Sequence, residues 1–382
     1  MKDRRLAIIG GGPGGLTLAR ILQTRGIEAT VFERDGSPDD RPQGGTLDLH
    51  TETGQHALRL AGLEAEFRAV ARPEDQGIRL YDPAGTLLHE ASGWDTESDR
   101  PEVDRALIRQ ILLDSLGPGV VRWGHKLQAV RPLGDGTHEL SFDNGQAGRF
   151  DLVVGADGAW SRIRPLVSDA VPTYSGVTFM EVNFDDVDAR HPEVARLVGR
   201  GMMFALGENR ALIGQRNGNA RICIYVALQV PEGWAASSGL AASGPVEAKA
   251  MLAARFVGWA STLLALIRQA GDRIFPWPIH ALPVGHRWEN RPGVTLIGDA
   301  AHLMSPLAGQ GANLAMRDAA DLACALADSD DWTTGVRAFE AEMFGRGAVA
   351  ARWSAERLES TFADDSLGQM LGQLQGHHEA AH

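Results

Sequence analysis

Short runs of mostly apolar residues recur along the chain, and each is followed by a glycine or an acidic residue. Residues 6–9 and 29–32 form two of these runs, and residues 294–297 form a third. A strand that is covered on both faces carries such a run, because neither of its faces meets water. The sequence therefore predicts buried strands at these three places, as is typical of an α/β fold.

A glycine-rich turn and a helix separate the first two predicted strands. The turn has the pattern G-x-G-x-x-G at residues 10–15, the helix is predicted over residues 16–25, and Glu33 ends the second strand. This βαβ unit has about the 30 residues expected of a dinucleotide-binding unit. The glycines let a diphosphate approach the backbone and the helix N-terminus, while the acid can bind ribose hydroxyls. The pattern thus predicts a Rossmann-like domain.

The middle of the chain has a different pattern, with several strands separated by short turns. The predicted strands cover residues 177–184, 201–206, 211–216 and 220–230. The dipeptide Asn217-Gly218 predicts a tight hairpin turn between the last two of them. A single helix is predicted over residues 246–269. This part of the chain therefore predicts an antiparallel sheet inserted in the α/β domain.

Apolar residues at helical spacing continue to the C-terminal region and predict one long helix that braces the two domains. The predicted domain organisation has three parts. Residues 1–174 and 281–330 form a discontinuous cofactor domain, residues 175–280 form an inserted β-sheet substrate domain, and residues 331–374 form the bridging helix.

Three glycine-containing segments lie far apart in the chain, at residues 10–15, 155–164 and 298–313. A cofactor that contacts all three must be long, which favours FAD. Asp299 ends a buried strand and is placed to accept hydrogen bonds from the ribitol chain of FAD. The helix predicted from Asn313 would present backbone N–H groups to the pyrimidine edge of the flavin, where a helix N-terminus stabilises the negative charge of the reduced ring.

Composition narrows the class of function. The 382 residues are 44% apolar and 23% charged, an ordinary globular composition with room for two domains. A net charge of −12 without a basic run argues against binding to nucleic acid or to an anionic membrane. Cys223 and Cys324 have no metal-ligand spacing and favour a reducing cytoplasm. No apolar stretch approaches the length of a membrane span.

Taken together, the three segments resemble the signatures of the single-component (class A) FAD-dependent aromatic hydroxylases. The resemblance rests on the glycine turn at 10–15, on Asp157-Gly158, and on Gly298-Asp299 with the Gly-Gln-Gly turn at 309–311. It covers nearly the whole chain and implies a glutathione-reductase-type FAD-binding domain. Residues 43–50 and 101–105 look most like the tetracycline-inactivating monooxygenases of that family.

The resemblance also implies a set of residues around FAD. Glu33 would bind the adenosine ribose, Arg105 would contact the ribityl and diphosphate region, and Arg41 would lie near the flavin. The full set is Gly10, Gly12, Gly15, Glu33, Arg34, Arg41, Asp48, Arg105, Asp157, Asp299, Pro306, Gly309, Gly311 and Asn313.

The Asp157-Gly158 segment has two interpretations. It is similar to a family motif implicated in both FAD and NAD(P)H binding, with Arg164 as a diphosphate contact. The alternative is a strand-end turn followed by a helix that Ser161 caps. No second G-x-G-x-x-G opens a βαβ unit, so the nicotinamide is expected to bind transiently at the FAD site.

The inserted sheet is expected to supply the wall of the substrate site. The candidates from strand position and from the cofactor side are Glu181, Met203, Gln215, Arg216, Cys223, Tyr225, Phe275, Met304 and Leu307. The tetracycline-inactivating enzymes hold their substrate with a glutamine and a histidine, where this chain has Glu181 and Cys223. That departure favours a related polycyclic or phenolic compound.

The resemblance implies that the flavin performs the chemistry, so neither a catalytic side chain nor a metal is expected. NADPH, or alternatively NADH, would reduce FAD, O2 would add to give a C4a-hydroperoxide, and one oxygen atom would pass to an electron-rich ring carbon. The expected partners are a small aromatic or polycyclic substrate and O2, and the expected state is a monomer or weak homodimer. Inactivation of a tetracycline-like antibiotic and hydroxylation in polyketide tailoring remain open as roles.

Three other functions share this fold. A flavin-dependent halogenase would need a W-x-W-x-I-P motif, of which residues 277–279 carry only a superficial likeness. An FAD reductase or dehydrogenase would form a product that gains no oxygen. A non-catalytic module of the Rab-escort type would have lost the cofactor determinants, yet Glu33, Asp299 and the glycine turn at 309–311 are all present.

Overall fold

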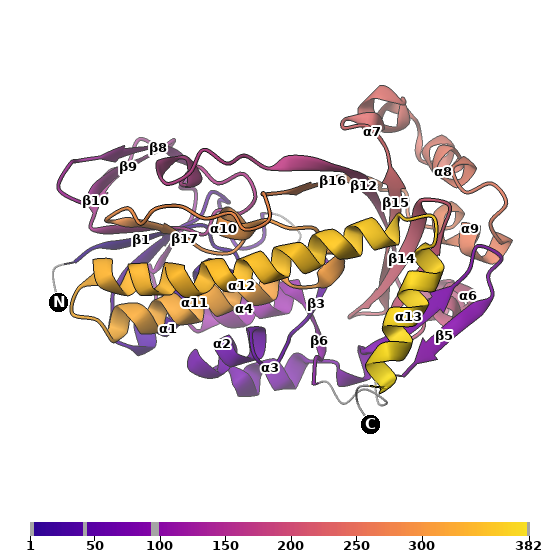
Figure 1. Ribbon diagram of the computed structural model, residues 1–382, viewed down its shortest axis with the longest axis horizontal. Coiled ribbons are helices and arrows are strands. Elements are labelled where there is room, and N and C mark those ends of the chain that lie inside the picture. The colour runs from indigo at the N-terminus through magenta and orange to yellow at the C-terminus, as the bar shows by residue number, and fades with distance from the viewer. Residues whose placement is uncertain (1–3, 41–43, 93–98, 380–382) are drawn as a thin grey trace.

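The computed structural model describes residues 4–40, 44–92 and 99–379, and its first layer is a parallel sheet (Figure 1). The five strands follow the order β17-β11-β1-β2-β7, and every neighbouring pair is parallel. Their bounds are Leu6–Ile9 (β1), Ala29–Phe32 (β2), Val121–Arg122 (β7), Leu152–Gly155 (β11) and Val294–Leu296 (β17). The three buried strands predicted from apolar runs are confirmed.

Helices cover one face of this sheet and a small antiparallel sheet covers the other (Figure 1). The helices are α1 (Pro13–Thr24), α4 (Arg105–Asp114) and α11 (Gly311–Ala327). The small sheet is formed by β8 (Leu127–Pro132), β9 (His138–Phe142) and β10 (Ala147–Phe150). The ring of Phe32 stacks on Phe142 with centroids 4.5 Å apart, which joins the two sheets through their apolar faces.

A short two-stranded ribbon and two helices lie beside the first domain, below α4 in Figure 1. The ribbon pairs β3 (Thr46–Asp48) with β6 (Glu102–Asp104) in antiparallel register. The helices are α2 (Gly54–Leu60) and α3 (Glu64–Val70).

The second large sheet has seven strands in the order β16-β12-β15-β14-β13-β4-β5. Their bounds are Gly77–Tyr81 (β4), Leu87–Ala91 (β5), Thr173–Phe184 (β12), Gly201–Gly207 (β13), Arg210–Asn217 (β14), Arg221–Gln229 (β15) and Phe275–Ala281 (β16). All neighbouring pairs are antiparallel except β13 with β4. Strands β4 and β5 come from residues that the sequence pattern assigned to the cofactor domain, so the sheet is larger than predicted.

One face of the second sheet is covered by a group of short helices. They are α5 (Val187–Arg190), α6 (Pro192–Val198), α7 (Trp234–Ser237), α8 (Pro245–Ala254) and α9 (Ser261–Arg268), with the single turns η1 (Pro73–Asp75) and η3 (Leu240–Ala242) nearby. The single helix predicted over 246–269 is wrong, because the chain breaks between α8 and α9. Gly258 adopts φ +92° there, and the rings of Phe256 and Trp259 turn into the core.

The hairpin between β14 and β15 differs from its prediction by two residues. Asn219 and Ala220, with φ of 55° and 51°, occupy the left-handed positions, while Asn217 still pairs with Arg221. The backbone N–H of Gly218 donates instead to Asp104 Oδ1 at 2.9 Å. A contact with β6 therefore shifts the turn away from the Asn217-Gly218 dipeptide.

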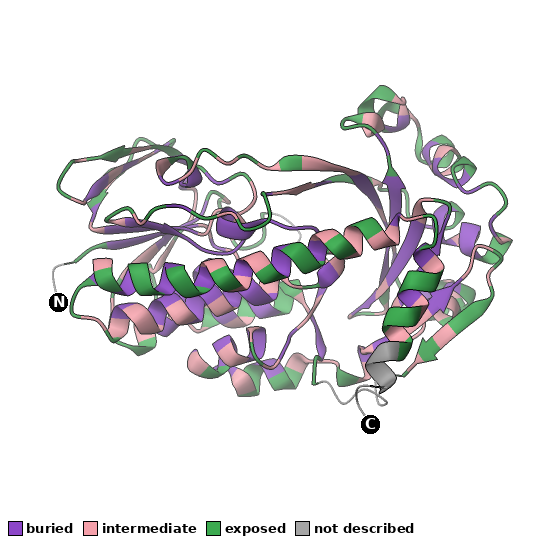
Figure 2. Cartoon of the chain, viewed as in Figure 1, coloured by how far each residue is buried: buried purple, intermediate pink, exposed green. Residues whose placement is uncertain are grey.

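The C-terminal region forms two helices instead of the one predicted to residue 374. Helix α12 (Trp332–Thr361) follows α11 and continues to the second sheet, and α13 (Ser366–Glu379) leaves its end at a steep angle and runs down across that sheet (Figure 1). The chain turns because the side chains of Phe362 and Met370 are buried against the second sheet. Figure 2 shows the corresponding division of α12 into an inner buried side and an outer exposed side. No helix within the described ranges is long and apolar enough to cross a membrane.

Candidate functional site

The three glycine-containing segments meet at the carboxyl ends of β1, β11 and β17. A Cβ on Gly10, whose φ is +113°, would lie 2.3 Å from the carbonyl oxygen of Ala156. A Cβ on Gly14 would lie 3.0 Å from the carbonyl oxygen of Ala315 in α11. Only glycine permits these approaches, so the predicted convergence of the segments is confirmed.

The N-terminus of α1 is open where a diphosphate is expected. A side chain on Gly12, the residue before the helix, would meet no other atom within 4 Å. Glu33 is 5% exposed and accepts hydrogen bonds from the Gly11 N–H at 2.6 Å and the Asp35 N–H at 3.1 Å. The acid is therefore fixed against the glycine turn, while the side chain of Arg34 is exposed.

The Asp157 segment is built as a capped turn. Asp157 Oδ2 accepts the Arg162 N–H at 2.7 Å, and Ser161 Oγ accepts the N–H groups of Ile163 and Arg164. The Arg164 guanidinium is buried and donates to the backbone carbonyls of Ala159, Asp299 and Ala300. These contacts match the interpretation of a capped turn, and they engage Arg164 with the backbone of the neighbouring segment.

Asp299 lies beside the start of α11. It begins the short helix α10 (Asp299–His302), is half-buried, and its carboxylate accepts no hydrogen bond within the described part of the chain. A Cβ on Gly311 would lie 3.7 Å from Asp299 Oδ1. The turn η4 (Pro306–Ala308) and Gly309, with φ 65°, lead into α11. A carboxylate and an uncapped helix N-terminus thus lie side by side.

Asn313 has its whole side chain engaged in the protein. Its Oδ1 accepts the N–H groups of His50 and Gly54 and the Thr53 hydroxyl, and its Nδ2 donates to the carbonyls of Asp48 and Gly309. The side chain therefore ties the β3 segment to α11. The Asp48 carboxylate lies at the same junction, 2.9 Å from His50 Nε2 and close to Gly309.

Two predicted cofactor arginines have different outcomes. Arg105 is exposed at the first position of α4, with its N–H bonded to the Gly45 carbonyl at 3.1 Å. Arg41 lies outside the described residues. The sequence analysis did not single out Arg109, which is buried in α4 and donates to the Pro38 carbonyl at 2.7 Å and the Gly11 carbonyl at 3.4 Å. Only its spacing from Arg105 on one helix could have indicated that role.

These features fit FAD. A diphosphate is bound by backbone N–H groups at a helix N-terminus, and a polyol is bound by a carboxylate that has acceptor capacity left. The open approach at Gly12 and the unengaged carboxylate of Asp299 supply both.

Five of the predicted substrate residues share one face of the second sheet. The register pairs Glu181 with both Tyr225 and Phe275, and Gln215 with Cys223. Directly paired antiparallel residues point to the same side of a sheet. A Cβ on Gly45 would lie 3.8 Å from the Tyr225 hydroxyl, and Leu307 of η4 packs against the same face. This face, which we call the inner face, therefore points toward the cofactor domain.

Three other candidates do not contribute to the inner face. Met203 is buried on the helix-covered side, and Met202 takes its place on the inner face. Arg216 also points to the helix side, where it pairs with Asp188. Met304 is buried between α11 and α12. Strand alternation divides the residues into two sets but does not say which set faces inward. Met203 and Arg216 were predicted to line the substrate site, but they belong to the set on the helix-covered side.

Two side chains of the inner face, the Cys223 thiol and the Tyr225 phenol, are held in their protonated forms by burial. Burial raises the pKa of the Cys223 thiol and the pKa of the Tyr225 phenol well above their ordinary values. Both groups are consequently neutral at physiological pH, and Cys223 is not a reactive thiolate. Tyr225, which is partly exposed, can offer a hydrogen bond to a ligand but no charge, whereas Cys223 is only 1% exposed and is part of the wall behind it.

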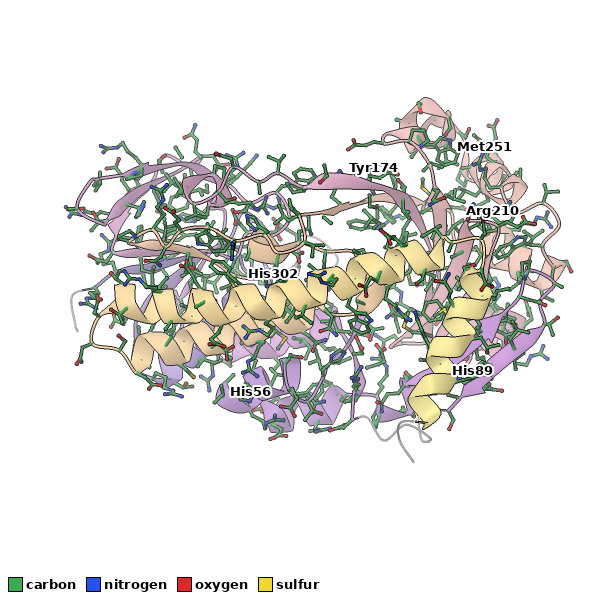
Figure 3. The ribbon with its side chains drawn as sticks, in the orientation of Figure 1. His56, His89, Tyr174, Arg210, Met251 and His302 are labelled. Carbon is green, nitrogen blue, oxygen red and sulfur yellow. The ribbon has the colours of Figure 1, made fainter. Side chains whose placement is uncertain are left out.

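A buried ion pair supports the Asp299 turn from behind. Asp318 of α11 is fully buried and accepts hydrogen bonds from His302 Nε2 at 2.6 Å, Arg346 at 2.9 Å and the Gly298 N–H at 3.0 Å. His302 also packs against Gly347 of α12 (Figure 3). This network was not predicted from the sequence, since its members lie on three different helices and only the fold brings them together.

Glu102 is a second titratable group that the sequence analysis did not single out. It is 4% exposed, lies opposite Asp48 in the β3–β6 ribbon, and accepts the Thr46 hydroxyl at 2.7 Å. Burial, followed by the charge of Asp48, raises the pKa of Glu102 to about 8. The side chain is therefore mainly neutral at pH 7.

Replacing Glu102 by glutamine should stabilise the protein at alkaline pH. An acid whose folded pKa is about 8 instead of 4.5 holds its proton in the folded state only, so the free energy of unfolding falls as pH rises between those values. The loss is up to about 1.4 kcal/mol per pH unit. Chemical unfolding of both proteins across this range should show the advantage of Glu102→Gln growing with pH. The exposed acid Glu28 supplies the control Glu28→Gln, and a pH-independent difference would show that Glu102 is ionised in the folded state.

Comparison with known proteins agrees with this site. Residues 3–238 and 245–331 match the family described as FAD binding domain. The monooxygenase asqM of Emericella nidulans is 32% identical over 371 residues, which cover 84% of this chain and 83% of that protein.

Solved structures share the whole fold. The structure of Klebsiella pneumoniae HpxO with FAD and uric acid has a TM-score of 0.79 at 23% identity and covers 99% of this chain and 92% of that chain. The tetracycline destructase Tet(51) has a TM-score of 0.71 at 18% identity and covers 97% of this chain and 94% of that chain. These likenesses establish the fold, whereas the family match and the fungal relative establish the class. The chain therefore belongs to the FAD-binding-domain family of FAD-dependent monooxygenases of the aromatic hydroxylase type.

Proposed function

We propose that this enzyme uses NADPH and O2 to insert one oxygen atom into a flat aromatic or phenolic ring system. The observation that carries this proposal is the inner face, because its aromatic and neutral polar side chains lie next to the Gly45 and η4 segments of the cofactor domain. Bound FAD would supply the redox chemistry. The protein's task is then to hold the ring and exclude water.

The described residues divide this task between them. Tyr225 offers a neutral hydrogen-bonding group, and Leu307 closes the face with an apolar side chain. The N–H groups of residues 311–313 precede the first hydrogen bond of α11, Leu314 N–H to the Gln310 carbonyl at 2.8 Å. They are free to stabilise negative charge that develops on a ring held beside Asp299.

NADPH is proposed to bind only transiently. The sequence has one G-x-G-x-x-G turn at the start of a βαβ unit, at residues 10–15, and FAD requires it. Arg164 is engaged with three backbone carbonyls, so it is not the anchor we propose for the diphosphate of NADPH. The exposed side chain of Arg105 is the better candidate.

The inner face favours a tailoring hydroxylase over a tetracycline-inactivating enzyme. HpxO, with uric acid bound in its structure, shows that the fold accepts a fused flat ring. Tet(51) shares the fold at 18% identity, which carries no substrate assignment. Glu181 and Cys223 stand where the tetracycline-inactivating enzymes use a glutamine and a histidine, and a carboxylate beside a buried thiol offers different hydrogen bonds from that pair.

Mass spectrometry with ¹⁸O2 tests the proposal. The purified holoenzyme should be incubated with NADPH and, in turn, tetracycline and a panel of polycyclic phenols. We expect one class of product to be heavier by a single labelled oxygen atom, and we expect it among the phenols. Labelled tetracycline would establish the inactivation role. NADPH oxidation that releases only peroxide with every compound would contradict the proposed substrate class, and a lack of NADPH oxidation by FAD-loaded protein would contradict the reductant.

A further inference from the structure

We propose that Glu181, Phe275 and Trp277 form a recognition site for a protonated nitrogen on the substrate, so that the enzyme selects aromatic compounds that carry a basic amine. The inference rests on the proposed function, because it names the substrate class of the same inner face.

The two aromatic side chains lie next to the carboxylate on the inner face, both on the neighbouring edge strand. Strand β16 is this edge strand, and its register pairs Phe275 with Glu181 and Trp277 with Phe179. Ile279, two residues further along, is buried in the inner-face core, which confirms the direction in which this row of side chains points. Phe275 and Trp277 nevertheless remain 44% and 54% exposed. Two large, largely exposed rings thus stand beside the Glu181 position, one directly opposite it and one diagonal to it.

The carboxylate itself is held in one orientation. Trp277 Nε1 donates to Glu181 Oε2 at 2.9 Å, and Asn183 Nδ2 donates to Oε1 at 3.0 Å. Each carboxylate oxygen can accept about two hydrogen bonds, so each keeps capacity for another donor. The contacts therefore preorganise the carboxylate without using it up.

No cation on the inner face neutralises this charge. Among the described residues of β12, β14, β15 and β16 that point to the inner face, the charged side chains are Glu181 and Arg221. Arg221 stands at the end of its strand and pairs with Asp185 at 2.9 Å. Cys223 and Tyr225 are neutral because burial raises the pKa of each. From the cofactor side, the cationic side chain of Arg105, at the start of α4, acts on Tyr225.

A carboxylate beside exposed aromatic rings is the chemistry that recognises an organic ammonium. The ring faces attract a cation through their quadrupoles, and the half-buried carboxylate accepts charge-assisted N–H bonds. The same carboxylate repels an acidic substrate. A merely structural role, in which Glu181 only positions Trp277, would give no preference between cationic and anionic ligands.

Three naphthalene probes separate these possibilities in the FAD-loaded enzyme. They are 1-naphthylmethylamine, 1-naphthalenemethanol and 1-naphthoate, and the dissociation constant of each is measured from the change in flavin absorbance. We expect the amine to bind roughly tenfold or more tightly than the acid, on the scale of one charge-assisted hydrogen bond. The alcohol should fall between them.

Glu181→Gln keeps the shape and can still accept the Trp277 N–H. It should weaken binding of the amine roughly tenfold and change binding of the alcohol by less than about twofold. Glu181→Lys should reverse the order of amine and acid. Trp277→Phe, which keeps a ring but loses the hydrogen bond, should weaken the amine less than Glu181→Gln does. Glu193→Gln, an exposed acid in α6 on the opposite side of the sheet, is the matched control.

Equal binding of amine and acid to the unaltered enzyme would overturn the inference, and so would an unchanged ratio in Glu181→Gln. Failure of all three probes to perturb the flavin would overturn it as well. None of these results bears on whether the enzyme incorporates labelled oxygen, so the proposed function stands or falls by the separate ¹⁸O2 experiment.

Discussion

Replacing Asp299 by alanine should give a folded protein that has lost most of its FAD. The carboxylate is half-buried and accepts no hydrogen bond from the described residues, so the fold loses no hydrogen bond when it is removed. A Cβ placed on Gly311, where α11 begins, would lie 3.7 Å from Asp299 Oδ1. We therefore expect the carboxylate to serve the ribitol of FAD, and a lost hydrogen bond to a charged group costs about 1.5–3 kcal/mol.

That range corresponds to a dissociation constant for FAD that is roughly 10- to 150-fold weaker. The ratio of flavin to protein absorbance gives the occupancy after purification, and quenching of flavin fluorescence gives the dissociation constant of the reconstituted protein. Glu289→Ala removes an exposed acid nearby in sequence and should change neither value. Full occupancy and activity in Asp299→Ala would show that this carboxylate does not hold the cofactor.

Replacing Asp318 by alanine should have the largest effect on stability. The substitution leaves His302, Arg346 and the Gly298 N–H without their shared acceptor. Breaking a buried ion pair on one side costs about 3–5 kcal/mol, because the remaining charge stays buried. The Gly298 N–H precedes Asp299, so we also expect FAD binding to weaken. Asp321→Ala, one turn along α11, removes a half-exposed acid paired with Arg317 and Arg346 and should cost less than about 1 kcal/mol.

The cost of Asp318→Ala should depend on pH. Burial alone would lower the pKa of His302, but the charge and hydrogen bond of Asp318 outweigh it and raise that pKa. Protonated His302 therefore stabilises the folded state. Its contribution to the free energy of unfolding is complete below the ordinary histidine pKa of 6.5 and is lost as pH rises through the raised pKa. Burial would likewise raise the pKa of Asp318, yet His302 and Arg346 lower it, so its contribution is complete above 3.8 and is lost at lower pH. Both contributions are present between these two values.

Urea unfolding of both proteins at about pH 5.5 and pH 8.5 measures this dependence. The difference in the free energy of unfolding should be larger at the lower pH. A difference that is the same at both pH values would mean that His302 is neutral in the folded protein and that the pair is held by hydrogen bonds alone.

Some acidic residues of the site could be predicted from local sequence patterns and others could not. Glu33 and Asp299 were predicted because each follows a buried strand and lies beside a glycine turn, and the chain direction alone places both at the carboxyl edge of a parallel sheet. His302, Asp318 and Glu102 were not predicted, since no local pattern shows which residues on other elements they contact. Their partners come from α12, α10 and the opposite strand of a ribbon.

The substrate face shows a different limit. Alternation in β13 and β14 correctly separates two sets of side chains, but nothing in the alternation says which set meets the helices. Met203 and Arg216 therefore seemed equivalent to Gln215 until the packing of α5, α6, α8 and α9 on one face was known. The pairing of β4 with β13 is a contact between residues more than a hundred positions apart, which no local pattern encodes.

The sequence by itself determined the elements whose physical cause is local: the βαβ unit with its glycine turn, the buried strands, the presence of the helices α1 and α11, and the use of FAD. Tertiary structure decided the features that depend on distant partners. It broke residues 246–269 and 331–374 into pairs of helices because buried aromatic and apolar side chains turn the chain inward, and it moved the hairpin after Asn217 because Asp104 binds the Gly218 N–H. It also chose the inner face, since a strand presents two faces and only the neighbouring layers determine which one is covered.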